Sequence, residues 1–225
     1  MKDGMNAPHC LDALKITLST AVERFPHNLV CRHLDEGTLT LAHYRTLLIT
    51  IFHQAYCGPY TFARAGVNCS WKYAAAKEYL IQHAEEERIH WRWILDDLRV
   101  IGYDGPDLRQ SPPHPTTQAY IGFNYYIAEE VPVARLAIAL VLETIGAMVA
   151  GTYGRKLLAT LNLQRSQATF FLNHADTDKK HIRDLASVIE SCELTDEDWC
   201  WMIHAAKTAG EFYRAMYDHA GYQLG

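Results

Sequence analysis

Apolar residues recur at intervals of three and four along most of the chain, which is the periodicity of amphipathic helices. No segment alternates convincingly between apolar and polar residues, as a half-buried strand would. We therefore expect an all-α fold in which seven helices form one bundle. The pattern places six of them over about residues 11–23, 38–66, 70–101, 120–128, 132–160 and 166–191, and a terminal helix from Thr195.

Glycine and proline mark where these helices bend or stop. Gly58-Pro59 lies inside the second expected helix, where the missing amide of proline predicts a kink. Ser70 is suited to cap the third helix, and Gly102 is suited to end it. Residues 103–117 hold four of the eight prolines, which predicts a surface loop between two similar halves of the chain.

The length of 225 residues suits one domain that spans residues 1–225. Lysine plus arginine (21) against aspartate plus glutamate (26) gives a net charge of −5 without a basic stripe, so we expect no nucleic-acid partner. Arg135 and Glu143 interrupt the most apolar stretch, and we expect neither a membrane span nor secretion. The six cysteines form no C-x-x-C pair, which favours a reducing, cytoplasmic location.

Two segments, one in each half of the chain, share the pattern H-x-x-x-[D/E]-x-x-H. They are His83-Ala-Glu-Glu-Glu87-Arg-Ile-His90 and His174-Ala-Asp-Thr-Asp178-Lys-Lys-His181. On a helix, positions i, i+4 and i+7 fall within a stripe about 60° wide, so each trio shares one face. Imidazole with carboxylate suits iron, manganese or zinc, and dimetal carboxylate bundles use this helical spacing. Together the two patterns predict a transition-metal centre, whereas surface histidines would explain either one alone equally well.

Glu143 stands alone in the apolar run from Ala137 to Ala150. A carboxylate is costly to bury there unless it is paired or binds a metal, so we interpret Glu143 as a bridging ligand. The alternative is an exposed glutamate on an amphipathic helix. His53 holds the corresponding place in the first half of the chain, where it either supports a ligand or simply packs in the core.

Several aromatic residues are candidates to line a substrate pocket near His53, because their rings are apolar and their tips polar. Ordinary core packing is the alternative for each of Tyr56, Tyr60, Phe123, Tyr125 and Tyr126. Cys57 and Cys69 lack an evident basic neighbour that would activate a thiolate, and the chain has no nucleophile-elbow, P-loop or dinucleotide-binding motif.

These motifs resemble those of the heme-oxygenase-like diiron oxidases and oxygenases, which share a fold with thiaminase II and pyrroloquinoline-quinone synthase. The resemblance covers most of the chain and implies a heme-oxygenase-like bundle. It rests on Leu34–Tyr44, on His83–Gly102, on Glu143 and, most specifically, on His174-x-x-x-Asp178-x-x-His181.

The resemblance implies a site for two iron ions, with O₂ as co-substrate; manganese also fits the ligand types. The implied ligands are Glu87, His90, Glu143, His174, Asp178 and His181. The family often has a glutamate seven residues before the first of these histidines, and here that position is His83. The first carboxylate therefore stays open between Glu87 and Glu86, and His83 becomes an additional ligand candidate.

The implied activity is O₂-dependent oxidation of a small amino-acid-like or fatty-acid-like metabolite. Desaturation, oxidative carbon–carbon cleavage and N-oxygenation all stay open. The alternatives are a metal-independent enzyme like thiaminase II or the quinone synthase, and a non-enzymatic module that binds heme or another ligand. The sequence determines neither the substrate nor the oligomeric state, for which a homodimer is one option.

Overall fold

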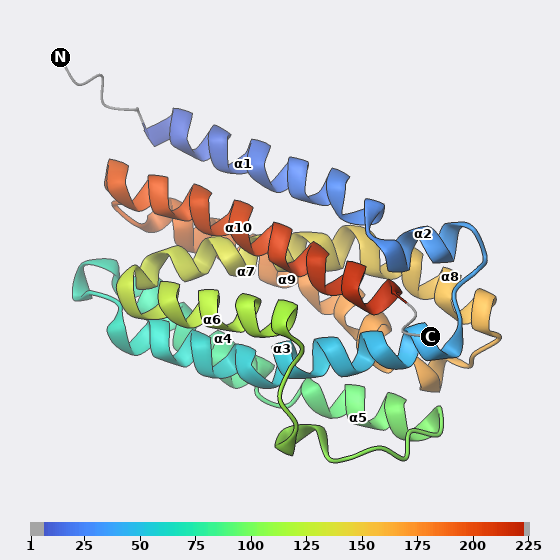
Figure 1. Cartoon of the computed structure of the whole chain (residues 1–225). Coiled ribbons are helices and arrows are strands. Elements are labelled where there is room, and N and C mark those ends of the chain that lie inside the picture. The colour runs from blue at the N-terminus through green and yellow to red at the C-terminus, as the bar shows by residue number, and fades with distance from the viewer. Residues whose placement is uncertain (1–6, 223–225) are drawn as a thin grey trace.

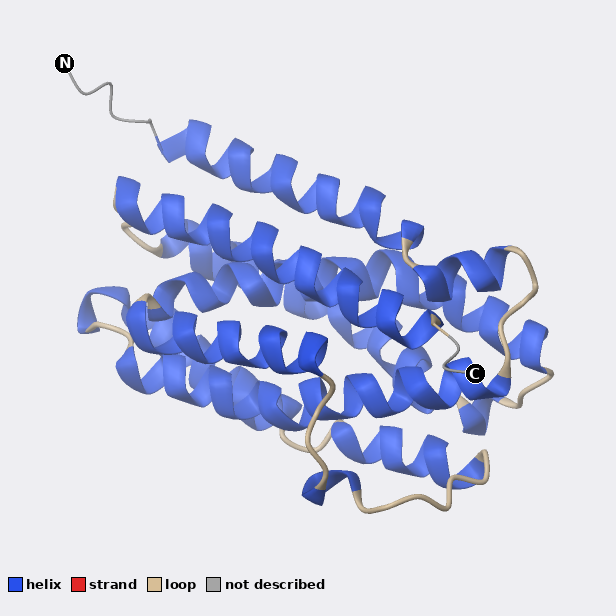
Figure 2. Ribbon diagram, in the orientation of Figure 1, coloured by secondary structure: helices blue, strands red, loops and turns tan. Residues whose placement is uncertain are grey.

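The computed structural model describes residues 7–222, apart from the side chains of residues 7, 8 and 175–179. This part of the chain is helical with short connections and no strand, so the all-α prediction is confirmed (Figure 2). Ten α-helices and one π-helical segment of the described chain lie side by side as a bundle (Figure 1). Their bounds are α1 Ala7–Arg24, α2 Leu29–Asp35, α3 Leu41–Asn68, α4 Ala74–Glu87, α5 Trp91–Val100, α6 Pro115–Glu130, α7 Arg135–Ile145, the π-helix Gly146–Ala150, α8 Gly151–Leu161, α9 Thr169–Ser191 and α10 Asp196–Gly221.

The described chain has more helical segments than the seven expected, for three local reasons. The short helix α2 was not expected; the Asn28 side chain caps it by accepting from Cys31 N at 2.9 Å. The helix expected over residues 70–101 is divided into α4 and α5. The helix expected over residues 132–160 is present as a continuous rod, but a π-helical turn separates α7 from α8.

Residues 88–90 divide the expected third helix, so the prediction of one continuous helix was wrong. Hydrogen bonds of the i→i+3 type replace the α-helical ones here: His90 N donates to Glu87 O at 3.2 Å, and Trp93 N donates to His90 O at 3.1 Å. This tighter winding changes the rotation per residue. His90 therefore lies beside Glu87, with His90 Nδ1 2.7 Å from Glu87 Oε2. The expected stop is confirmed, because α5 ends at Val100 and Gly102 has φ +77°.

The rod formed by α7, the π-helix and α8 occupies the middle of the bundle, where α7 packs against α1, α9 and α10 (Figure 1). Within the described chain, only Pro132–Leu161 is long and apolar enough to cross a membrane, and 67% of its apolar window is buried inside the protein. Such burial is typical of a core helix. The π-helix begins three residues after Glu143, and π turns are frequent at functional sites.

A buried carboxylate of α5 caps the start of α9. Asp97 is 0% exposed and accepts three hydrogen bonds: from Thr169 N at 2.8 Å, from Thr169 Oγ1 at 2.7 Å and from Phe170 N at 3.0 Å. The first amides of a helix have no partner within the helix, so this carboxylate satisfies them. Burial raises the pKa of Asp97 above its ordinary value although these hydrogen bonds oppose the change. The contact links α5, which begins directly after His90, to α9, which carries His174 and His181.

A glycine allows α3 and α4 to approach closely. A Cβ atom at Gly66 would lie 2.6 Å from Ile81 Cγ1 and 3.2 Å from Ile81 N, which is too close for any other residue. Since α4 carries His83 and Glu87, this approach positions the first ligand helix. Pro59 lies inside α3, where the sequence predicts a bend.

Candidate metal centre

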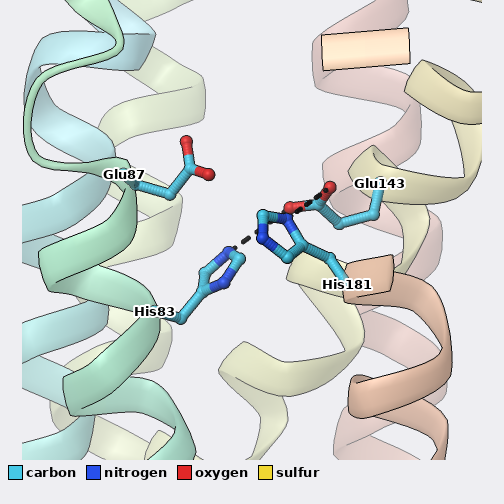
Figure 3. A group of neighbouring side chains, drawn as sticks. All are labelled: His83, Glu87, Glu143 and His181. Atoms are coloured by element: carbon cyan, nitrogen blue, oxygen red, sulfur yellow. Dashed lines mark ion pairs between the residues drawn. The ribbon is translucent and has the colours of Figure 1, made fainter. Parts of the chain in front are cut away.

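Four of the predicted side chains converge from three helices (Figure 3). His83 and Glu87 extend from α4, Glu143 from α7 and His181 from α9. One ligand atom of each lies within 4.8 Å of the others. The group is enclosed, because His83 is 1% and His181 3% exposed. We call these four side chains the first ligand group.

Two histidine nitrogens of the first group face a carboxylate without forming a hydrogen bond to it. His83 Nε2 lies 3.3 Å from Glu143 Oε1, and His181 Nδ1 lies 3.3 Å from Glu143 Oε2. Both nitrogens are buried, and neither has a hydrogen-bond partner among the described residues. Unpaired nitrogens beside buried carboxylates are what a cation would join, so the residues present fit a bound transition metal.

The other ring nitrogen of each histidine is held by a neighbour. The Tyr79 hydroxyl lies 3.4 Å from His83 Nδ1, and Glu86 Oε2 accepts from His181 Nε2 at 3.2 Å. Such contacts fix which nitrogen can bind a metal. Between the two glutamates left open by the sequence, Glu87 lies in the ligand group, whereas Glu86 is outside it and orients His181.

A second ligand group adjoins the first and shares Glu87 with it. Ligand atoms of Glu87, His90 and His174 lie within 4.8 Å of one another. His90 Nδ1 donates to Glu87 Oε2 at 2.7 Å, and His174 Nε2 lies 3.9 Å from the same oxygen. His174 Nδ1 donates to Phe170 O at 2.8 Å, which leaves Nε2 facing the site. Asp178 lies in α9, but its side chain is outside the described residues, so its role as a ligand stays a prediction.

The surroundings of Glu87 and Glu143 favour the ionised form of both carboxylates. Burial tends to raise the pKa of Glu87, but the ion-pair contact with His174 and the hydrogen bond from His90 outweigh it and hold this pKa well below its ordinary value. Burial likewise opposes ionisation of Glu143, and contacts with His181 and His83 bring the pKa of Glu143 down to about 2.

The histidines show the reciprocal effect. Burial tends to lower the pKa of His174, but Glu87 raises it above the ordinary value, and Glu143 does the same for His181. Protons on these imidazoles thus balance the carboxylates when no metal is bound. A metal ion would displace them, because only a neutral imidazole binds a metal.

A cavity of about 130 Å³ adjoins both ligand groups, and His83, Glu87, Glu143 and His174 all contribute to its wall. Most of the remaining lining is apolar. Along α7, the π-helix and α8 the lining residues recur every three or four positions, as Ala139, Leu142, Gly146, Ala150, Tyr153 and Leu157. One face of the central rod therefore forms a long wall of the cavity.

The structure does not place the predicted pocket residues at this cavity. His53 is buried beside Phe52, and Tyr56 packs against Phe52 and Trp91. Tyr60 is 57% exposed. Tyr125 is 41% exposed. Phe123 and Tyr126 contact α10, where Phe123 packs on Phe212 and Tyr126 on Trp201.

The lining face of α3 explains this difference. Leu47, Gln54, Gly58 and Phe62 line the cavity, at intervals of seven and four residues. Tyr56 follows Gln54 by two positions, which is about 200° around a helix, so it points away. Residue type alone suggested aromatic lining, but helix rotation decides which residues reach the cavity.

Sequence reasoning missed one buried polar residue of the cavity wall. Arg135 is 2% exposed and lines the cavity from the start of α7. The signal was present, because Arg135 is a lone charge in the same apolar stretch as Glu143. The cost of burying a charge, which pointed to Glu143, applies equally to Arg135.

Solved structures of other proteins are similar to this chain in fold. A domain of unknown function with a heme oxygenase-like fold from Shewanella denitrificans has a TM-score of 0.84 and 23% identity, over 93% of this chain and 91% of that chain. A TenA homologue from Pseudomonas syringae has a TM-score of 0.74 and 13% identity, over 94% and 92%. Heme oxygenase-1 from the cyanobacterium Synechocystis, solved in complex with heme, has a TM-score of 0.67 and 13% identity, over 93% and 91%.

The described helices therefore form a heme oxygenase-like fold, as the resemblance in the sequence implied. No curated protein sequence matches the chain significantly. A family model described as iron-containing redox enzyme matches residues 51–212, which is well over half of the chain. The chain belongs to this family of iron-containing redox enzymes.

Proposed function

We propose that this protein is an O₂-dependent non-heme diiron oxidase or oxygenase that acts on a small amphipathic metabolite. The observation that carries the proposal is the pair of ligand groups that share Glu87. Two groups with a common carboxylate suit two neighbouring metal ions. Membership of an iron-containing redox family favours iron over the manganese that the same ligands accept.

In this proposal His83, Glu143 and His181 hold one ion, and His90 and His174 hold the other. Glu87 belongs to both groups and would contribute to holding both ions, whereas the sequence had suggested a bridging role for Glu143. Asp178, one helical turn beyond His174, supplies the remaining carboxylate of the second site. Bound ferrous iron would supply electrons that reduce O₂, and the oxidised centre would then accept electrons from the substrate.

The chain's own residues provide position and environment. Tyr79 and Glu86 orient His83 and His181, so the ligand nitrogens face the site before any metal arrives. The apolar wall from Ala139 to Leu157 excludes water and favours an aliphatic substrate. Desaturation, carbon–carbon cleavage and N-oxygenation are all compatible with this environment.

Hydrolysis of the thiaminase II type is less well supported, because it would need an activated nucleophile. The thiol nearest to such a role is Cys31, which lines the cavity, but burial raises its pKa to about 12. Burial also raises the pKa of Cys57. Neither residue is therefore a thiolate at neutral pH.

A heme-binding role is less well supported for a steric reason. A heme needs open space beside one axial histidine. Here the His83 and His181 nitrogens each lie 3.3 Å from Glu143, so a carboxylate already occupies the space that a porphyrin would need beside either nitrogen.

Anaerobic titration with Fe²⁺ followed by exposure to O₂ tests the proposal. The protein should bind two equivalents of iron and change its visible absorption on meeting O₂. His174→Ala should lose one equivalent, whereas His204→Ala, at an exposed position of α10, should retain both. A single equivalent in the wild type, or equal binding by both variants, would contradict a diiron site.

The cytoplasmic location stays a prediction that the thiols support. Cys31, Cys57, Cys69, Cys192 and Cys200 are all free, as expected in a reducing compartment.

A further inference from the structure

One buried cation of the cavity wall has no role in the ligand groups. Arg135 begins α7 and is 2% exposed. Its Nε donates to Thr61 Oγ1 at 3.2 Å, and its guanidinium lies 3.6 Å above the ring of Phe62. Its Nη1 is buried without a hydrogen-bond partner among the described residues. No described carboxylate lies within ion-pair distance of it.

This arrangement is incomplete for a purely structural arginine. A guanidinium carries five N–H donors, and buried donors are normally satisfied by the protein. Burial lowers the pKa of Arg135 to about 10, so the side chain is still a cation at neutral pH. Tyr120, Glu143 and Glu87 act on Arg135 electrostatically from a distance, but they do not outweigh the effect of burial. A buried cation without an ion-pair partner is costly, and an anion that enters the cavity and contacts it would reduce that cost.

We propose that Arg135 binds the carboxylate of a substrate whose apolar chain lies along the cavity. This inference rests on the proposed function, because it names the substrate class of the same site. The planar guanidinium matches a carboxylate in a two-point contact. The single positive charge of Arg135 matches the single negative charge of a carboxylate. A dianionic phosphate would need a second cation beside Arg135, and no other arginine or lysine of the described chain lines the cavity.

The order of residues along the central rod gives the direction of the substrate. Arg135 precedes Glu143 by eight residues, a rise of about 12 Å along the helix. On the other side of Glu143 the wall is apolar, with Gly146, Ala150 and Leu157. The ligand groups thus lie between the cation and the apolar wall. A chain anchored at Arg135 passes the metal centre, which places its carbon–hydrogen bonds near the ions.

Calorimetric binding of decanoate and of 1-decanol, without O₂, tests this assignment on metal-free and iron-loaded protein. The two probes share a chain and differ in charge. The wild type should bind decanoate about 10- to 100-fold more tightly than decanol, which is the worth of a charged hydrogen-bonded contact. Arg135→Gln should abolish this preference and leave decanol binding within about threefold. Arg64→Gln, at an exposed arginine paired with Glu129, should retain the preference.

Several outcomes would overturn the assignment. Equal binding of the two probes by the wild type is one, and this comparison does not depend on any variant folding. Decyl phosphate binding more tightly than decanoate is another. Equal weakening of both probes in Arg135→Gln and Arg135→Lys would indicate a structural role. Iron stoichiometry is measured in parallel: two equivalents with no decanoate preference refute only this inference, whereas fewer refute the diiron proposal.

Discussion

Three consecutive glutamates at the end of α4 occupy three different environments, so replacing each by glutamine separates their roles. Glu85 is exposed and pairs with Arg88. Glu86 is a third exposed and orients His181. Glu87 belongs to both ligand groups. Glutamine keeps the size of each side chain and removes only its charge.

The structure assigns a different magnitude to each substitution. Glu87→Gln breaks buried charged contacts, which typically costs about 3–5 kcal/mol, so iron affinity should fall more than about 100-fold. Glu86→Gln weakens the support of one ligand and should cost about 10- to 100-fold. Glu85→Gln removes a surface ion pair worth about 0–1 kcal/mol to stability and should leave iron affinity within about twofold.

Competition for Fe²⁺ against a chelator of known affinity, under argon, measures all three variants on one scale. The expected order of affinity is Glu85→Gln, then Glu86→Gln, then Glu87→Gln. A Glu87→Gln protein that retains two equivalents at wild-type affinity would refute the shared-ligand geometry. Equal losses in Glu85→Gln and Glu87→Gln would show that net charge, and not coordination, sets the affinity.

Four further predictions concern stability, each read from thermal unfolding. Asp97→Ala should destabilise the protein by about 1–3 kcal/mol, because the amides at the start of α9 lose their acceptor. Asp96→Ala, on the exposed face of α5, should change the free energy of unfolding by less than about 0.5 kcal/mol. Gly66→Ala should destabilise by about 1–3 kcal/mol through its clash in the α3–α4 contact, whereas Gly122→Ala, with open space around it, should stabilise α6 by up to about 1 kcal/mol. Iron at about 100 times its Kd should add about 2.7 kcal/mol, and an unchanged melting temperature would count against a tight site. The raised pKa of His181 stabilises the metal-free protein fully below about pH 6.5, and this stabilisation is lost as the pH rises through the raised pKa. The metal-free protein should therefore have a lower melting temperature at pH 8 than at pH 6. The iron-loaded protein should not show this decrease, because the metal replaces the proton on the imidazole.

Much of the ligand set was predictable because helical spacing and local composition carry it. His83, Glu87 and His181 recur at one-turn intervals within their segments, and Glu143 stands out against an apolar run. Periodicity predicts a shared face from neighbours alone. The structure brings these side chains together, whereas their role as metal ligands stays a prediction.

What the sequence did not predict depends on contacts between distant segments. The position of Glu86 beside His181 follows from how α4 and α9 pack. The cavity wall likewise depends on helix rotation, which turns Gln54 inward and Tyr56 outward. A one-dimensional pattern does not contain that rotation. Arg135 was predictable, because the cost of burying a lone charge in an apolar stretch, which singled out Glu143, applies to Arg135 as well.

The carboxylate of Glu87 lies in both ligand groups, so two ions bound there could not load independently. The group with four described ligand atoms would fill first and, in doing so, hold this carboxylate in place for its neighbour. That is a coupling free energy between adjacent sites, and it favours the empty and doubly loaded forms over the half-loaded one. Such coupling would limit reactions of O₂ with a single bound ion, because protein that holds only one ion would be scarce at equilibrium.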